Sequence, residues 1–309
     1  MSPETINVKK RNGRGLEPLD IQKIHSMVHY ACENLSGVSE SQVEMSSGLQ
    51  FYDGITTDEI QQILIKSASD LITLENPNYQ YVAARLLLFS LRKSLHHRLW
   101  EHPHLKVHIS NCIEKGVYDP EILSWYDPHE IESMNEMIKH DRDYLFSYAG
   151  LRQVVDKYLV QDRSTGDIFE TPQYMYMMIA ATLFRNYDTE KRLSYVKKYY
   201  NAISQHLINI PTPVMAGVRT PLRQFASCVL VDSDDTLPSI FSSDMAIGRY
   251  VSQRAGIGIN AGRIRGINSR IRGGEVQHTG VIPFLKKFEA TVKCCTQNGV
   301  RGGSATVHF

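Results

Sequence analysis

Residues 211–237 read P-T-P-V-M-A-G-V-R-T-P-L-R-Q-F-A-S-C-V-L-V-D-S-D-D-T-L, and the character of the chain changes where they begin. Within them, Phe225 to Val231 is a near-continuous apolar run, as expected of a strand buried on both faces. Helix and strand patterns then alternate, at about 237–254, 256–260, from Pro283 and from Ala305. Strand, helix, strand, helix, strand predicts a parallel α/β sheet.

The chain before this stretch has a different pattern. A short strand at 6–10 leads to the hairpin signal Asn12-Gly13, and Asp20 is placed to cap a helix. Thr56 and Glu59 have the spacing of a capping box, and a third helix is expected to open at Asn76-Pro77. From about 96 to 210 the apolar periodicity is largely helical. We therefore predict an α/β and α protein with three domains, at 1–95, 96–210 and 211–309.

Composition excludes several classes of function. The 309 residues carry a formal net charge of +1, so no general attraction to nucleic acid or to an anionic membrane is expected. No apolar run is long enough to span a bilayer, and the first residues have no signal core, which favours the cytoplasm. The five cysteines are odd in number and scattered, without C-x-x-C pairs or metal-ligand spacing. We expect neither a disulfide framework nor a bound metal.

Cys228 is the first candidate for chemistry. A single cysteine in a buried strand is more often a small hydrophobic residue than a reactive group. Its surroundings favour chemistry, because a proline-rich loop precedes the strand and glycine turns crowd the next two strands. Parallel α/β proteins place their sites at strand ends and in the loops that follow. Both interpretations stay open on these residues alone.

Several polar clusters suggest anion or nucleotide sites, each with an ordinary alternative. Asp235-Thr236-Leu237 lies where a strand turns into a helix, which suits an anion or a ribose but also a simple cap. A second cluster lies among glycines and suits either phosphate binding or a solvated loop: Arg263, Arg265, Arg270 and Arg272. A third lies beside glycines at the first hairpin and suits either a triphosphate or a plain polar turn: Lys9, Lys10 and Arg11.

Together these blocks resemble a known family. The chain is similar over essentially all its residues to the large catalytic subunit of class I aerobic ribonucleotide reductase. The most specific blocks are V-K-K-R-N-G, Q-F-Y-D-G-I, Y-Q-Y-V-A-A-R-L, K-Y-L-V-Q-D-R, G-V-R-T-P-L-R-Q-F-A-S-C-V-L-V, Y-V-S-Q-R-A-G-I-G-I-N-A-G-R-I-R and G-V-R-G-G-S-A-T. The resemblance implies an ATP-cone at 1–95, a helical domain, and the first strands of a ten-stranded α/β barrel.

The resemblance also implies roles for individual residues. In the ATP-cone, an ATP or dATP pocket would be lined by Lys10, the segment from Glu17 to Lys23, Thr57 and Lys93. Gln61 and Ser90 stand where base-side histidines are expected, which leaves dATP inhibition in doubt.

In the barrel, Cys228 would be one of two redox cysteines that reduce the ribose C2′ position. The implied substrate residues are Thr212, Ser227, Ala255, Gly256, Gln297 and Arg301, and the implied effector-specificity residues are Asp235, Thr236, Leu237, Arg265 and Arg272. Gln297 and Arg301 belong to a loop, 296–304, expected to carry the effector's message to the substrate base.

Cofactors and partners follow from the same resemblance. ATP or dATP and deoxynucleoside triphosphates such as dTTP and dGTP would act as effectors, and thioredoxin or glutaredoxin would supply a dithiol. A small subunit would hold the radical cofactor, and the large subunit would form a dimer.

The remaining catalytic groups of the family have no counterpart in this sequence: a thiyl-radical cysteine, an acidic base, an asparagine and the second redox cysteine. We therefore expect the N-terminal part of a split large subunit, completed by a C-terminal fragment on a second polypeptide. The alternative is a catalytically inactive, nucleotide-binding regulatory fragment.

Overall fold

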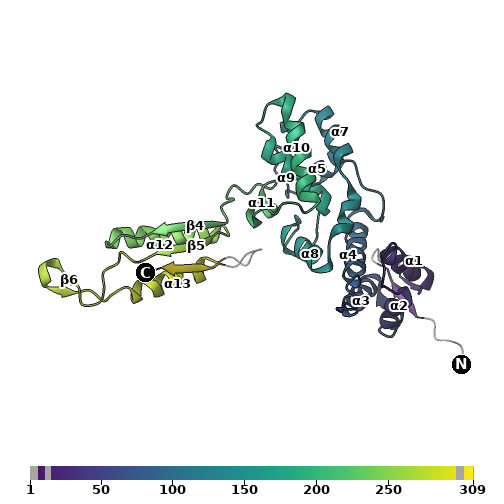
Figure 1. Ribbon diagram of the computed structural model, residues 1–309, viewed down its shortest axis with the longest axis horizontal. Helices are drawn as coiled ribbons and strands as arrows, with labels where there is room; N and C mark the ends of the chain where they lie inside the picture. The colour runs from purple at the N-terminus through teal and green to yellow at the C-terminus, as the bar shows by residue number, and fades with distance from the viewer. Residues whose placement is uncertain (1–5, 11–14, 297–302, 309) are drawn as a thin grey trace. The chain divides into compact units, whose positions relative to one another are not determined.

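The computed structural model describes residues 6–10, 15–296 and 303–308 of the chain (Figure 1). Its contacts divide the chain into two compact units. The first holds residues up to Asn209 together with Arg219–Pro221, and the second holds Ile210–Val218 and the residues from Leu222 onward. The change of character read from the sequence near 211 therefore coincides with a change of unit. The predicted boundary near 95 lies inside the first unit, and it stays a prediction.

The first unit opens with a small mixed sheet and four helices. Strand β1 (Asn7–Lys9) pairs antiparallel with β2 (Leu16–Pro18) and parallel with β3 (Ile55–Thr56). The helices that follow are α1 (Ile21–Cys32), α2 (Glu40–Gly48), α3 (Thr57–Asp70) and α4 (Tyr79–His96). The turn signal Asn12-Gly13 lies outside the described residues, but the antiparallel pair around it is present.

Local capping explains where these helices begin. The Asp20 carboxylate accepts a hydrogen bond from the Gln22 N–H at 3.1 Å, and Thr56 and Glu59 form the predicted capping box. Two expectations need correction. The third predicted helix begins at Tyr79 rather than within Asn76-Pro77. Helix α2 was not predicted, because only Val43 and Ser47 of its residues are buried and its apolar periodicity is weak.

The rest of the first unit is helical, as the periodicity predicted. Helix α9 is apolar on all sides and buried from Pro172 to Thr182, so it forms the centre around which the others pack. The elements are α5 (Leu105–Glu114), α6 (Ile122–Trp125), α7 (Pro128–Met137), η1 (His140–Leu145), α8 (Tyr148–Gln153), η2 (Val154–Tyr158), α9 (Pro172–Phe184) and α10 (Thr189–Ser204).

An ion pair is buried inside this helical region. The Arg219 and Glu170 side chains are both fully buried, and the Arg219 Nε lies 2.9 Å from Glu170 Oε2. The same carboxylate accepts the Val160 N–H at 2.7 Å and the Tyr118 hydroxyl at 2.5 Å. Every oxygen of the buried carboxylate is therefore satisfied, which is the condition under which such a pair is tolerated.

A cluster of aromatic rings also lies in this region, around Tyr174. His108 stacks on the Tyr174 ring with centroids 4.0 Å apart, and His102 stacks on His140 at 3.6 Å. His96 contacts both His102 and Tyr174 edge to face. Burial lowers the pKa of His96 to about 4, and those of His102 and His108 to about 3. Burial also lowers the pKa of His140, so all four rings are neutral at pH 7.

The second unit is built on a three-stranded parallel sheet. The strand order is β4 (Cys228–Asp232), β5 (Gly256–Asn260) and β8 (Ala305–His308). Two helices, α12 (Leu237–Ser252) and α13 (Ile282–Cys295), connect them, and a short helix α11 (Thr212–Gly217) precedes them. A small hairpin, β6 (Arg270–Ile271) and β7 (Val276–Gln277) around η3 (Arg272–Gly274), lies beyond the end of the sheet (Figure 1). The alternation predicted from the sequence is confirmed.

The burial predicted for the first strand of this sheet is wrong for one face. Val229 and Val231 pack with Ile257 and Ile259 against α12 and α13. The opposite face is uncovered in the described chain: Cys228 is exposed, and Leu230 is 87% exposed. The strand also begins at Cys228 rather than Phe225. An apolar run makes a strand suitable for burial on both faces. Whether each face is buried depends on whether another element of the fold covers it.

Candidate functional site

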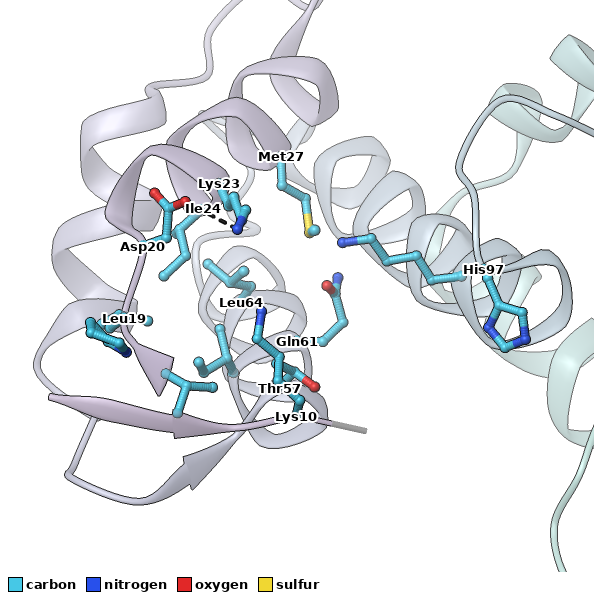
Figure 2. Close-up of a pocket in the computed structure, with 14 residues that line it drawn as sticks. Lys10, Leu19, Asp20, Lys23, Ile24, Met27, Thr57, Gln61, Leu64 and His97 are labelled. Carbon is cyan, nitrogen blue, oxygen red and sulfur yellow. Dashed lines mark ion pairs between the residues drawn. The ribbon is translucent and has the colours of Figure 1, made fainter. Parts of the chain in front are cut away.

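A cavity in the first unit lies between the small sheet and helices α1, α3 and α4. Its volume is about 330 Å³, within the range of small-molecule sites. Figure 2 shows side chains from all these elements converging on one space. The lining residues include Lys10, Thr57 and Lys93, which the resemblance singled out, and most of the polar and apolar positions of the segment from Glu17 to Lys23, namely Pro18, Leu19, Asp20 and Lys23. The apolar wall comes from Val8, Ile24, Met27, Ile60 and Leu64.

Two of the three lysines that line this cavity form ion pairs with acidic side chains. The Lys10 ammonium lies 3.0 Å from the carboxylate of Glu17, which is itself beside the cavity and not among its lining residues. The Lys23 ammonium lies 3.2 Å from Asp20 (Figure 2). The hydrogen bond from Lys23 lowers the pKa of Asp20 despite the opposing effect of burial. Thr57 is the first residue of α3, where helix N–H groups favour an anion.

Gln61 and His97 define the remainder of the cavity wall. Gln61 is buried and donates through Nε2 to the Leu86 carbonyl at 2.9 Å, which fixes its amide. Ser90, the other position where a histidine was expected, is not among the lining residues. His97 lines the cavity from the end of α4, in the left-handed conformation with φ of 59°. Sequence reasoning missed His97, because no local pattern places a residue beyond a helix end against a distant sheet.

A second cluster lies in the second unit, just past the carboxyl ends of β4 and β5. The Asp235 carboxylate accepts two hydrogen bonds from Arg265, from its backbone N–H at 3.0 Å and from Nε at 2.6 Å. Burial acts to raise the pKa of Asp235, but the hydrogen bonds and charge of Arg265 lower it overall. The two residues, 30 apart in sequence, therefore form one charged unit at the sheet edge.

The neighbouring predicted residues take different places. The helix cap is Thr236, whose hydroxyl accepts the Ser239 N–H at 3.3 Å, so Asp235 is not the cap. Leu237 is the first residue of α12 and is 54% exposed. Arg272 lies in the η3 turn of the β6–β7 hairpin and is exposed, with φ of 50°. The structure thus joins Asp235 and Arg265 and leaves Arg272 on the hairpin.

The third cluster lies at the opposite, amino end of the same strands. Cys228 is the register partner of Gly256, and the Gly256 N–H donates to the Ser227 carbonyl at 2.9 Å. Ala255 is buried beside them. Thr212 begins α11 and lines a small pocket with Gln253 and Arg254, the residues just before Ala255. Cys228 therefore lies at the amino ends of these strands, away from the carboxyl ends where parallel α/β proteins usually place their sites, and its role in chemistry stays a prediction.

Glycine on the uncovered face of β5 leaves the space beside Cys228 and Leu230 open. Gly256 and Gly258 stand opposite these two residues in register. A β-carbon at Gly258 would lie 2.7 Å from Leu230 Cδ2, the end of an exposed side chain that is able to turn aside, so this position accepts glycine but does not require it. Gly256-x-Gly258 is a strand feature rather than a phosphate-binding turn.

Two of the predicted substrate residues, Gln297 and Arg301, lie outside the described residues. Over the part of the chain that the structure describes, no three His, Cys, Asp or Glu side chains are arranged to hold a metal ion. No helix there is long and apolar enough to cross a membrane.

Comparison with protein families defines the class. The ATP cone domain matches residues 6–94, the all-alpha domain of ribonucleotide reductase matches residues 144–223, and its barrel domain matches residues 226–309. These follow the order of the small sheet with its helices, the helical region and the parallel sheet.

Whole-chain relatives point to the same family. The chain is 52% identical over 306 residues to ribonucleoside-diphosphate reductase 1 subunit alpha of Salmonella typhimurium and 51% identical to that of Escherichia coli. It is 46% identical over 308 residues to the subunit alpha of Enterobacteria phage T4. Each match covers 99% of this chain and 40% of the relative. The chain belongs to the ribonucleotide reductase large-subunit family and spans about 40% of the length of these relatives.

Proposed function

We propose that this chain forms the regulatory and effector-binding part of a ribonucleoside-diphosphate reductase, and that it supplies one redox thiol, Cys228, to the active site. The observation that carries the proposal is the placement of two clusters on one strand pair. Cys228 faces Gly256 at the amino end of β4 and β5, and Asp235 binds Arg265 past their carboxyl ends. A substrate at one end and an effector at the other would thus share the same two strands.

The geometry suits communication between such sites. Five residues of β4 separate the two ends, which is roughly 13 Å of extended chain. Coupling requires that each ligand favour one of two states of the structure between them. Asp235 and Arg265 tie the start of α12 to the loop after β5, so an effector that engages either side chain acts on both connections.

The uncovered sheet face supports the need for further barrel strands. Leu230 on this face is 87% exposed, and β4 and β8 are edge strands of the described sheet. Exposed apolar strands with open edges associate with other strands unless they are covered. We propose that the C-terminal part of a large subunit pairs here and brings the second redox thiol. In the balanced reaction, two thiols become a disulfide, the C2′–O bond breaks and its hydroxyl leaves as water with one thiol hydrogen, and a C2′–H bond forms with the other.

Helix α12 offers a surface for the dimer. Leu237, Phe241 and Met245 are spaced four residues apart and are each more than half exposed. A stripe of this kind on one helix face is typical of a partner interface. We assign it to self-association of the large subunit, while the radical-generating small subunit and a thioredoxin or glutaredoxin remain proposed partners. A cytoplasmic location stays a prediction.

The ATP-cone domain supports binding of a nucleotide effector. We propose ATP or dATP as the ligand of the 330 Å³ cavity, with the lysines facing the phosphates and the apolar wall facing the base. Because the described lining residues of this cavity all belong to the first unit, a second candidate function has its own support. A nucleotide-binding regulatory protein without catalysis would need only this part of the chain.

Activity of a reconstituted complex tests the proposal. The chain is purified with a polypeptide that carries the remaining barrel and with a small subunit, and reduction of a ribonucleoside diphosphate by a dithiol is measured. Cys228→Ser should abolish turnover while binding of dTTP is retained, and Cys294→Ser, the matched control, should keep turnover. Wild-type turnover by Cys228→Ser would remove this thiol from the mechanism. A chain that binds nucleotide but yields no turnover in any such complex would support the regulatory alternative.

A further inference from the structure

Helix α13 ends in two adjacent cysteines that the proposed reaction does not use. Cys294 and Cys295 are its last residues, and their sulfur atoms lie 3.7 Å apart. Cys294 is exposed and Cys295 is partly exposed, so a small molecule is able to reach both. The pair is therefore an accessible dithiol, distinct from Cys228 on the sheet.

The packing beneath α13 accommodates the sulfur of Cys295. A β-carbon on Gly248 of α12 would lie 3.2 Å from this sulfur, closer than such contacts normally allow. Glycine at this position therefore leaves room for the thiol between the two helices. The Cys294 sulfur turns back along its own helix and donates to the Thr291 carbonyl at 3.4 Å. Packing against α12 and a hydrogen bond within α13 therefore hold the two sulfur atoms close together.

This geometry disfavours a disulfide. The α-carbons of consecutive residues lie about 3.8 Å apart, below the range of about 4.4–6.8 Å that disulfides normally span. Bridging the two sulfurs would require the last turn of α13 to change its backbone. The Cys295 thiol donates a hydrogen bond to the Cys294 sulfur, and this hydrogen bond, followed by burial, raises the pKa of Cys295. The raised pKa keeps the Cys295 thiol protonated and slows its attack on other disulfides.

The same geometry favours a single atom bound by both sulfurs. Two sulfur atoms 3.7 Å apart, each bonded at about 2.3 Å to one shared atom, subtend an S–M–S angle of about 107° at that atom. This value suits a tetrahedral or pyramidal centre and excludes a linear one. Soft centres prefer sulfur ligands. The described residues provide no third His, Cys, Asp or Glu ligand in a metal-binding arrangement, so a centre that needs only two protein ligands fits best.

We propose that Cys294 and Cys295 form a bidentate site for a soft, pyramidal thiophilic centre of the trivalent arsenic type. In the reaction with phenylarsine oxide, both S–H bonds and the As=O bond are lost, two As–S bonds form, and one water leaves. Arsenic stays trivalent, so no oxidant or reductant is required. Occupation of the site fixes the end of α13 against Gly248 of α12.

Intact mass measurement on the full chain tests the site. The protein is reduced with a non-thiol phosphine, treated with one equivalent of phenylarsine oxide, and challenged with excess 2-mercaptoethanol. One adduct should survive this monothiol and be removed by 2,3-dimercaptopropanol, because only a chelating dithiol competes with two sulfurs. Cys294→Ser and Cys295→Ser should each lose the resistant adduct, while Cys228→Ser, Cys32→Ser and Cys112→Ser should retain it.

Two results would overturn the proposal. The first is a monothiol-resistant adduct that persists in both Cys294→Ser and Cys295→Ser, since another pair of thiols would then be the site. The second is rapid loss of two hydrogens from the peptide containing residues 294 and 295 under mild oxidation by diamide, since the pair would then form a disulfide readily. Circular dichroism of each serine variant, expected to match the unsubstituted chain, establishes that loss of the adduct is not loss of the fold.

Discussion

The four histidines around Tyr174 predict that this chain loses stability on mild acidification. In the unfolded chain a histidine has a pKa of about 6.5, whereas burial lowers the pKa of His108 in the folded chain to about 3. The folded state therefore binds fewer protons than the unfolded state between these values. For a histidine with a lowered pKa, the full stabilisation is present above pH 6.5 and is lost as the pH falls toward the folded pKa.

The size of the effect follows from the two pKa values. At pH 5.5 an unfolded histidine is about ten-elevenths protonated while His108 is still neutral, which costs about 1.4 kcal/mol of unfolding free energy. His96, His102 and His140 have the same sign and are also neutral at this pH. Burial raises the pKa of Asp143 to about 6 even though Arg92 opposes it, and this gives back on the order of 1 kcal/mol at pH 5.5. The net loss is about 5 kcal/mol, comparable to the whole stability of many domains.

Urea unfolding of the reduced chain at pH 7.5 and at pH 5.5 measures this loss. His108→Phe keeps a ring against Tyr174 and should reduce the difference between the two pH values by about 1.4 kcal/mol. The matched control is His129→Gln on the surface of α7, which should leave the difference unchanged. An unfolding free energy at pH 5.5 within about 1 kcal/mol of the value at pH 7.5 would refute the reasoning.

Two further predictions concern the buried ion pair and the cone cavity. Arg219→Met leaves Glu170 as an unpaired buried charge and should cost about 3–5 kcal/mol of unfolding free energy, whereas Lys66→Met, from the exposed pair with Asp70, should change it little; equal effects in urea titrations would contradict this account. Lys10→Ala should weaken ATP binding about 10- to 100-fold by calorimetry, since a hydrogen bond to a charged group contributes about 1.5–3 kcal/mol. Lys9→Ala, the control, changes an exposed residue outside the cavity lining and should bind ATP normally; an unaltered affinity in Lys10→Ala would exclude Lys10 from the site.

Comparison of sequence and structure separates local from long-range information. The capping box of Thr56 and Glu59 spans four residues, and the sequence alone predicted it correctly. The contact of Asp235 with Arg265 spans 30 residues, and the pair of Arg219 and Glu170 spans 49. Neither pair has a local signature, because each exists only when strands and helices have already been brought together.

The candidate sites divide in the same way. The resemblance named Lys10, Lys23, Thr57 and Lys93, and these residues line one cavity, although their role in binding nucleotide stays a prediction. His97 of the same cavity was missed. The exposure of Cys228 was missed as well, because periodicity reports how apolar a strand is and not which of its faces another element covers.

The sequence by itself determined the caps at Asp20 and Thr56 and the alternation of strand and helix from residue 211 onward, since these depend on interactions within a few residues. Only the tertiary structure decided which charges are paired, which histidines are kept neutral and which face of β4 is left open. The physical reason is that burial and ion pairing depend on what stands opposite a side chain, and in this protein the opposing residue is usually tens of positions away.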